Sequence, residues 1–136
     1  MFNYLRTIGA HSGAPEPECM PVAAAAVFCK GCICEMSAGV LANSFTEGKS
    51  KFLVLEEKKA NDGKRAVKCI RVLPGMIFEA DFTGDPTELA AGMLVTPLLG
   101  GDDNYIYCED GEGGTIEVVD ASEYESTGRI TVTIHC

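Results

Sequence analysis

The sequence predicts an all-β fold, a small β-barrel or a sandwich, and three observations support this prediction. Short apolar runs recur at intervals of roughly 8–15 residues, which is typical of small all-β domains. Residues 129–136 alternate with a period of two and place Ile130, Val132, Ile134 and Cys136 on one face, as in a half-buried strand. Clusters of Gly and Asp, such as residues 109–114, separate the runs and suit tight turns.

The composition limits the classes of protein to which the chain can belong. With 136 residues and a mass of 14.4 kDa, we expect one domain that buries about 68% of its extended-chain surface. A net charge of −9 disfavours nucleic acid and anionic membranes as partners, because both are negatively charged. No apolar run approaches the ~20 residues of a transmembrane helix, and we expect no secretory signal. The seven cysteines are therefore expected to be reduced thiols that pack as small hydrophobic side chains.

Residues 1–21 are predicted to form an extended N-terminal arm and not a strand of the core. Three prolines, Pro15, Pro17 and Pro21, forbid a helix and favour a polyproline-like path. A fully extended arm of this length would reach about 70 Å, which is well beyond the domain itself.

The arm has two interpretations, a frayed terminus or a segment that docks on a neighbouring subunit. Apolar side chains close to the terminus favour docking, because a purely solvated tail does not need them. The predicted contact residues of the arm are Phe2, Tyr4, Leu5, Ile8, Pro15 and Pro17.

Residues 22–136 are predicted to form the barrel-like domain, with eight or so strands and almost no helix. Residues 22–29 hold four alanines between Pro21 and Gly31, and we interpret this short run as a closely packed strand. A Met-Ser-Ala-Gly turn at residues 36–39 predicts a hairpin. The strands predicted after it cover residues 51–57, 66–73, 76–82, 93–96, 105–108, 115–119 and 129–135, and residues 87–91 suit one helical turn. The last four strands are expected to form a meander.

The cysteines give the sharpest local pattern but not a complete metal site. Cys29-Lys30-Gly31-Cys32 has the spacing of half a zinc site, and a tetrahedral site needs four ligands. The other thiols, at Cys19, Cys69, Cys108 and Cys136, are scattered, so we favour ordinary packing and predict no metal.

No stretch carries a convincing catalytic motif, so we predict no enzymatic activity and no cofactor. The two histidines, His11 and His135, lie near the chain ends and follow no nucleophile motif. The acidic residues at 102–103 and 109–112 lack the ligand spacing of a calcium loop and are interpreted as solvated turns. The basic residues between 49 and 71 are interpreted as a solvated face, with an acidic partner surface as the alternative.

The order of strands and turns resembles the capsid decoration, or cement, proteins of tailed bacteriophages with an HK97-type shell. The resemblance covers roughly residues 22–136. It rests on patterns of strand and turn in five stretches, Phe28–Leu41, Lys51–Glu57, Val67–Glu79, Leu89–Val95 and Ile116–Ile134. The four-alanine run and the cysteine-rich hairpin depart from the family pattern.

The resemblance implies a β-barrel or β-tulip domain on the outside of a virion capsid, assembled in the host cytoplasm. Such a protein would bind the major capsid protein across subunit seams, form a homotrimer and stabilise the shell. A different virion β-module, such as a tail or head–tail connector component, is the alternative, and a small metal-binding β-domain is a third hypothesis.

Overall fold

The structure is a computed structural model in which every regular element is a β-strand. It describes residues 2–7, 15–44, 46, 48–83, 90–99, 106–110, 116–122 and 128–134. Within these ranges the chain forms eleven strands, so the predicted all-β class is confirmed. The helical turn predicted at residues 87–91 lies mostly outside the described residues.

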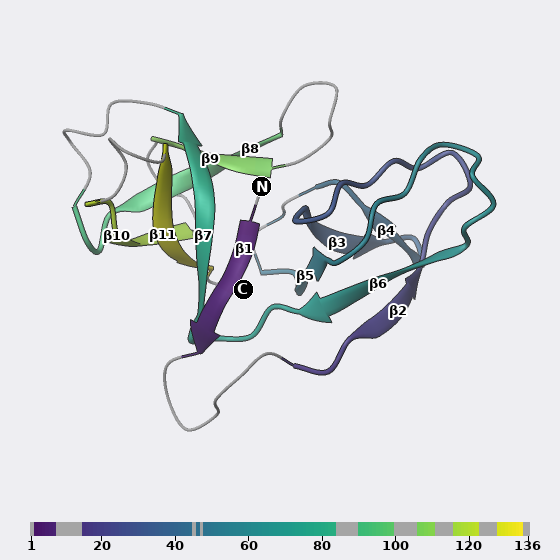
Figure 1. The fold of residues 1–136 in the computed structure, drawn as a ribbon, viewed down its shortest axis with the longest axis horizontal. Helices are drawn as coiled ribbons and strands as arrows, with labels where there is room; N and C mark the ends of the chain where they lie inside the picture. The colour runs from purple at the N-terminus through teal and green to yellow at the C-terminus, as the bar shows by residue number, and fades with distance from the viewer. Residues whose placement is uncertain are drawn as a thin grey trace.

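The strands form two sheets, which Figure 1 shows side by side. Sheet A has the order β1-β7-β11-β10-β8-β9 and sheet B the order β2-β6-β5-β3-β4. The strands of sheet A are β1 (Phe2–Thr7), β7 (Met76–Thr83), β8 (Leu94–Leu99), β9 (Ile106–Asp110), β10 (Ile116–Asp120) and β11 (Arg129–Ile134). The strands of sheet B are β2 (Glu18–Pro21), β3 (Ile33–Ser37), β4 (Val40–Ala42), β5 (Lys51–Val54) and β6 (Ala66–Arg71). The two sheets do not close into one barrel and are consistent with the predicted sandwich.

Neighbouring strands are antiparallel, with one exception in sheet A. Strand β9 also pairs in parallel with β7, through Phe82 with Cys108 and Thr83 with Glu109. This pairing brings the far end of sheet A back to β7, so the sheet is strongly curved. The predicted meander is wrong in its order, because β10 lies between β11 and β8 and does not follow β9.

The N-terminal segment belongs to both sheets, which corrects the predicted division into an arm (1–21) and a domain (22–136). Strand β1 pairs along β7, with Phe2 opposite Ala80, and Phe2 is only 1% exposed. The backbone N–H of Phe2 donates to the carbonyl oxygen of Gly31 at 2.8 Å, which ties the same strand to the segment before β3. Strand β2 in turn forms an edge of sheet B.

The sequence explains why these residues become strands despite the nearby prolines. Phe2 and Tyr4 face the core while Asn3 is exposed, which is the period of two of a half-buried strand. Pro15 and Pro17 precede β2, and Pro21 ends it on the edge of the sheet, where a missing N–H costs no interior ladder bond. The chain therefore starts in sheet A, builds sheet B over residues 18–71 and returns to sheet A at residue 76.

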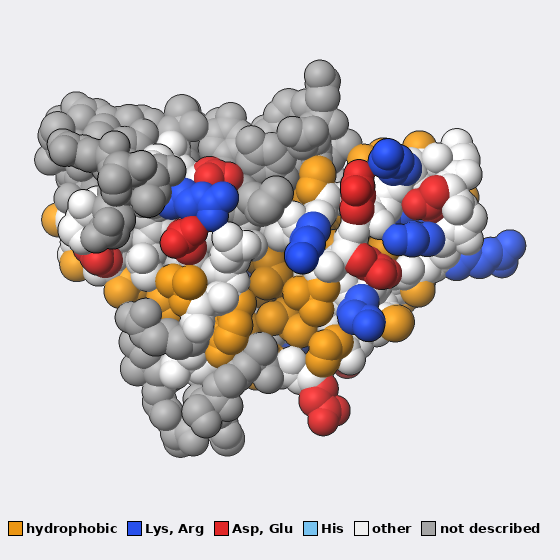
Figure 2. Space-filling view, viewed as in Figure 1, with side chains coloured by type: hydrophobic (Ala, Val, Ile, Leu, Met, Phe, Trp, Pro, Cys, Tyr) orange, Lys and Arg blue, Asp and Glu red, His pale blue; other side chains and the backbone are white. Residues whose placement is uncertain are grey.

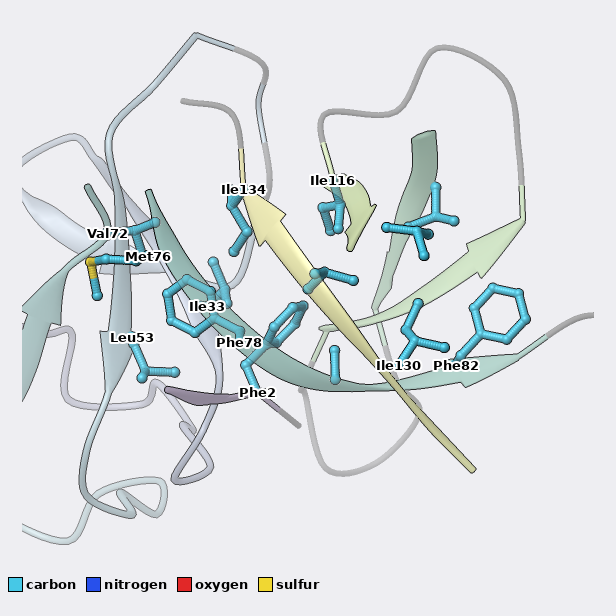
Figure 3. Packing of buried hydrophobic residues seen from close by; sticks show 14 of the residues in the cluster. Phe2, Ile33, Leu53, Val72, Met76, Phe78, Phe82, Ile116, Ile130 and Ile134 are labelled. Carbon is cyan, nitrogen blue, oxygen red and sulfur yellow. The ribbon is translucent and has the colours of Figure 1, made fainter. Parts of the chain in front are cut away.

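The larger of two hydrophobic clusters joins the two sheets, and Figure 3 shows its packing. The ring of Phe78 on β7 meets Phe2 and Tyr4 edge-on, at centroid distances of 6.4 and 6.1 Å. From sheet B, Ile33, Leu53 and Ile70 point into this same cluster. The predicted alternation of β11 is confirmed for its described residues, because its isoleucines and valine are buried in the core.

A second hydrophobic cluster covers the other face of sheet B. Val22, Phe28, Cys32, Cys34, Leu41, Phe52, Val54, Val67 and Cys69 form this second cluster. Residues 22–29 lie over it but are not the predicted strand, because their only ladder contact is the bridge between Phe28 and Lys58. Both faces of sheet B are therefore buried, which explains why all four residues of β5 are inaccessible.

If β1 is a structural strand, replacing Phe2 with Ala should destabilise the whole protein. Removing a fully buried aromatic ring leaves a cavity, and we expect a loss of about 3 kcal/mol in the free energy of unfolding. Denaturant unfolding of Phe2→Ala and of the exposed neighbour Asn3→Ala measures this difference. Equal stabilities for the two variants would show that the N-terminal segment is a dispensable arm.

Candidate interaction surface

A hollow lies where β1 meets sheet B, with a volume of about 340 Å³. We call it the seam cavity. Its lining residues come from β1, from the extended stretch before β2, from the turn before β3, and from β5 and β6. They are Phe2, Asn3, Tyr4, Pro15, Pro17, Lys30, Gly31, Leu53, Val54, Leu55 and Ile70. Figure 2 shows a hydrophobic patch in the middle of the molecule, between the regions of the two sheets.

Local backbone geometry fixes the position of the cavity wall. The N–H of Cys32 donates to the carbonyl of Cys29 at 3.2 Å, which closes a tight turn. Gly31 occupies this turn with a φ of 91°, a conformation that a residue with a Cβ adopts only with strain. The carbonyl of Gly31 is then free to accept the N–H of Phe2, so that the turn and β1 form one continuous wall.

The cavity is apolar, with a single positive charge at its border. Lys30 is exposed and is the only charged side chain among the described lining residues. A surface of this kind suits an apolar side chain or segment from a partner, and the lysine favours one that carries a carboxylate.

The structure brings together four of the six predicted contact residues. Phe2, Tyr4, Pro15 and Pro17 all line the seam cavity, although Phe2 and Tyr4 mainly serve the core. Leu5 is 44% exposed on β1 and does not line the cavity. The sixth contact residue, Ile8, lies outside the described residues.

Sequence reasoning missed the wall that sheet B supplies. Leu53, Leu55 and Ile70 lie more than thirty residues from Pro17 along the chain, and no local pattern shows that they meet it. The alternation of residues 51–55 indicated which side chains share a face, but not which segment would cover that face.

Buried charges are the first places to look for catalysis, and Glu35 and Lys51 form one such pair. They lie opposite each other on β3 and β5, with side chains 2% and 0% exposed and a nitrogen–oxygen distance of 3.6 Å. Ser44 and Thr46 donate hydrogen bonds to the Glu35 carboxylate at 2.6 to 2.8 Å. Lys51 also donates to the carbonyls of Thr46 and Lys49. The pair therefore fastens Ser44, Thr46 and Lys49 to sheet B and offers no reactive group to solvent.

The same contacts determine the acidity of Glu35. Burial alone would raise the pKa of this carboxyl, but the hydrogen bonds from Ser44 and Thr46, together with the nearby Lys51 charge, outweigh it and lower the pKa to about 2. The carboxylate is consequently charged at every physiological pH.

Lys58 is a second buried cation with a structural role. Its ammonium donates to the carbonyls of Ala24, Ala26 and Lys59 at 2.8 to 3.1 Å, and it lies 3.6 Å from Asp62. The interpretation of residues 49–71 as a solvated basic face is therefore wrong for Lys51 and Lys58, which are both buried. Lys58 holds the alanine-rich loop over the second cluster.

None of the five described cysteines is in a disulfide bond, and three of them are buried where their thiols are less acidic. Burial raises the pKa of Cys32 to about 12 and that of Cys69 to about 11, and it raises the pKa of Cys34 as well. Among the residues that the structure describes, no three Cys, His, Asp or Glu side chains are grouped to hold a metal ion. His11 and His135 and the side chains of Cys108 and Cys136 lie outside these residues.

No known protein family, no curated protein and no solved structure matches this chain. In the described part of the chain, no helix is long and apolar enough to span a membrane.

The lowered pKa of Glu35 predicts a specific dependence of stability on pH. The folded pKa of about 2 lies below the ordinary value of 4.5, so the stabilising contribution is complete above pH 4.5 and is lost as the pH falls toward 2. The shift corresponds to a contribution of about 3 kcal/mol at neutral pH.

Unfolding free energies of the wild type and of Glu35→Gln, measured from pH 7 down to pH 2, test this expectation. The wild type should lose more stability than the variant over this range, and Glu57→Gln, at an exposed site, should behave as the wild type does. Parallel pH profiles for the wild type and Glu35→Gln would contradict the assigned contacts.

Proposed function

We propose that the chain is a non-enzymatic structural protein of a bacteriophage virion. In this proposal it binds the exterior of the capsid, contacts the major capsid protein across subunit seams and stabilises the shell. Copies of the chain also associate with one another as a homotrimer at each binding site on the capsid. The resemblance in strand and turn order is the source of the virion assignment.

The observation that carries the proposal is the seam cavity. It is an apolar hollow on the surface, and it collects residues of the N-terminal segment that the sequence marked for partner contact. A hydrophobic hollow with a polar border has the anatomy of a protein-binding site, in which one or two inserted side chains supply most of the affinity.

The placement of β1 affects how the chain would bind a capsid. Strand β1 is fixed in the core, so the binding surface is largely formed before a partner arrives and little entropy is lost on binding. Binding to the folded shell stabilises that shell by mass action, and many copies on one lattice give firm overall attachment from modest individual contacts.

The chemistry of the described residues supports a role without catalysis. The buried carboxylate of Glu35 is neutralised by Lys51, and Arg129 forms ion pairs with Glu79 and Asp81 at 2.7 and 3.2 Å. These groups have structural partners, and the buried thiols are protonated at neutral pH because their pKa values are raised.

Capsid binding through the seam cavity can be tested with two exposed lining residues. The double variant Pro17→Glu, Lys30→Glu places negative charge at the apolar hollow and reverses its one positive charge. We expect about tenfold weaker binding to DNA-free capsids of the phage that encodes the chain, measured by cosedimentation.

The double variant Pro74→Glu, Lys59→Glu is the matched control, because it makes the same charge change at exposed residues outside the cavity. It should bind capsids as the wild type does. Equal binding of both double variants would exclude the seam cavity as the contact, and failure of the wild type to bind capsids would overturn the proposed function itself.

A further inference from the structure

The charge of this chain is divided unevenly along its sequence. Residues 15–74, which build sheet B, contain nine lysines and arginines and seven acidic residues. Residues 75–136, which build most of sheet A, contain one arginine and thirteen acidic residues. At physiological salt the Debye length is about 8 Å, so a docking partner senses these local charges more than the net charge of −9.

Sheet B carries a second hollow, with a volume of about 390 Å³, which we call the basic hollow. Its lining residues are Met20, Met36, Lys49, Ser50, Phe52 and Arg71. The ring of Phe52 is only 2% exposed and forms the floor of the hollow, and Met20 and Met36 are half-buried in its wall.

Arg71 is held at the border of this hollow while remaining accessible. Its guanidinium carbon lies 5.1 Å from the centroid of the Phe52 ring, a cation–π geometry. Its ion pair with Glu18, at 3.8 Å, joins two side chains that are 44% and 46% exposed, so the pair is weak and exchangeable. Methionine side chains adapt to an inserted apolar group, which makes such a surface suitable for docking.

A surface complementary to the basic hollow, with exposed apolar side chains beside acidic ones, lies on sheet A. Met93 and Leu94 are 40% and 41% exposed although both are large hydrophobic residues. Glu117 lies directly opposite Leu94 on the neighbouring strand, and exposed Asp120 follows three residues later. The N–H of Val118 donates to the carbonyl of Met93 at 2.8 Å, so this acidic–apolar patch has a fixed backbone.

We propose that the basic hollow of one copy receives the Met93–Leu94 corner of a second copy of this chain. The apolar side chains would enter between Met20, Met36 and Phe52. The carboxylates of Glu117 and Asp120 would then face Lys49 and Arg71, which gives the contact its orientation.

The contact uses two different surfaces of each copy, so every copy offers one hollow and one patch. Repeated contacts of this kind build a ring when the rotation between copies closes. The inference rests on the self-association in the proposed function but not on capsid binding, so it is tested with the isolated protein.

Two charge reversals, one in each surface, provide the test. Sedimentation velocity gives the association state of the wild type, Arg71→Glu and Asp120→Lys at about 0.05 M and about 0.5 M NaCl. We expect the wild type to associate at the lower salt concentration and to weaken at the higher one. Each variant alone should have a dissociation constant about tenfold larger.

An equimolar mixture of the two variants should associate more tightly than either variant alone. Two of the three contacts in a mixed trimer then pair an intact hollow with an intact patch, or one reversed surface with the other. Lys59→Glu, which changes the charge by the same amount in the turn at the other end of β6, should associate as the wild type does. Leu94→Glu repeats the patch test through its apolar side chain if Asp120→Lys unfolds.

Three results would overturn the proposal. The first is a wild type that remains monomeric at both salt concentrations, which would also count against self-association in the proposed function. The second is association that neither variant weakens, which would leave self-association standing but assign it to another surface. The third is a mixture that associates no better than its components.

Discussion

The docking of β1 is the interaction on which the rest of this structure depends. One side of the strand pairs with β7, its Phe2 ring packs on Phe78 in the core, and its first N–H bonds to the turn at Gly31. A strand taken from the start of the chain thus completes sheet A and attaches it to sheet B. Because β7 follows β1 by about seventy residues, this pairing is a long-range contact whose loop-closure entropy must be offset by the core that it completes.

The position of β1 also explains where the exposed apolar surface of the molecule lies. Both faces of sheet B are buried, one by sheet A and the other by residues 22–29. The seam cavity lies beside β1, and residues of the alanine-rich loop do not line the basic hollow. The buried ion pair of Glu35 and Lys51 holds Ser44, Thr46 and Lys49, and Lys49 is part of the wall of the basic hollow. The same architecture that stabilises the chain therefore provides surfaces for other proteins.

Sequence reasoning succeeded where the signal is local and failed where pairing is distant. The alternation of β11, the apolar face of β7 and the hairpin of β3 and β4 could all be predicted, because side chains two residues apart report one strand face. The same alternation exists in Phe2, Asn3 and Tyr4. However, this segment is short and precedes a proline-rich stretch, so its sequence gave no indication of a partner strand. The burial of Lys51 and Lys58 was equally invisible, since it depends on carbonyl groups of loops that fold back over them. Four of the predicted contact residues line one cavity, but the opposite wall of that cavity comes from strands that no short motif connects to them.

Native-state hydrogen exchange at the amide of Phe2 tests the central claim most directly, because that amide bonds to Gly31 across the two sheets. Suitable references are the amides of Val118 in sheet A and Val54 in sheet B, which are bonded to Met93 and Cys32. The structure predicts that all three open with free energies within about 1 kcal/mol of one another, as parts of one cooperative unit. Exchange of the Phe2 amide near the rate of an unfolded peptide, while the two references stay protected, would show that the first strand is a detachable arm and would contradict this account.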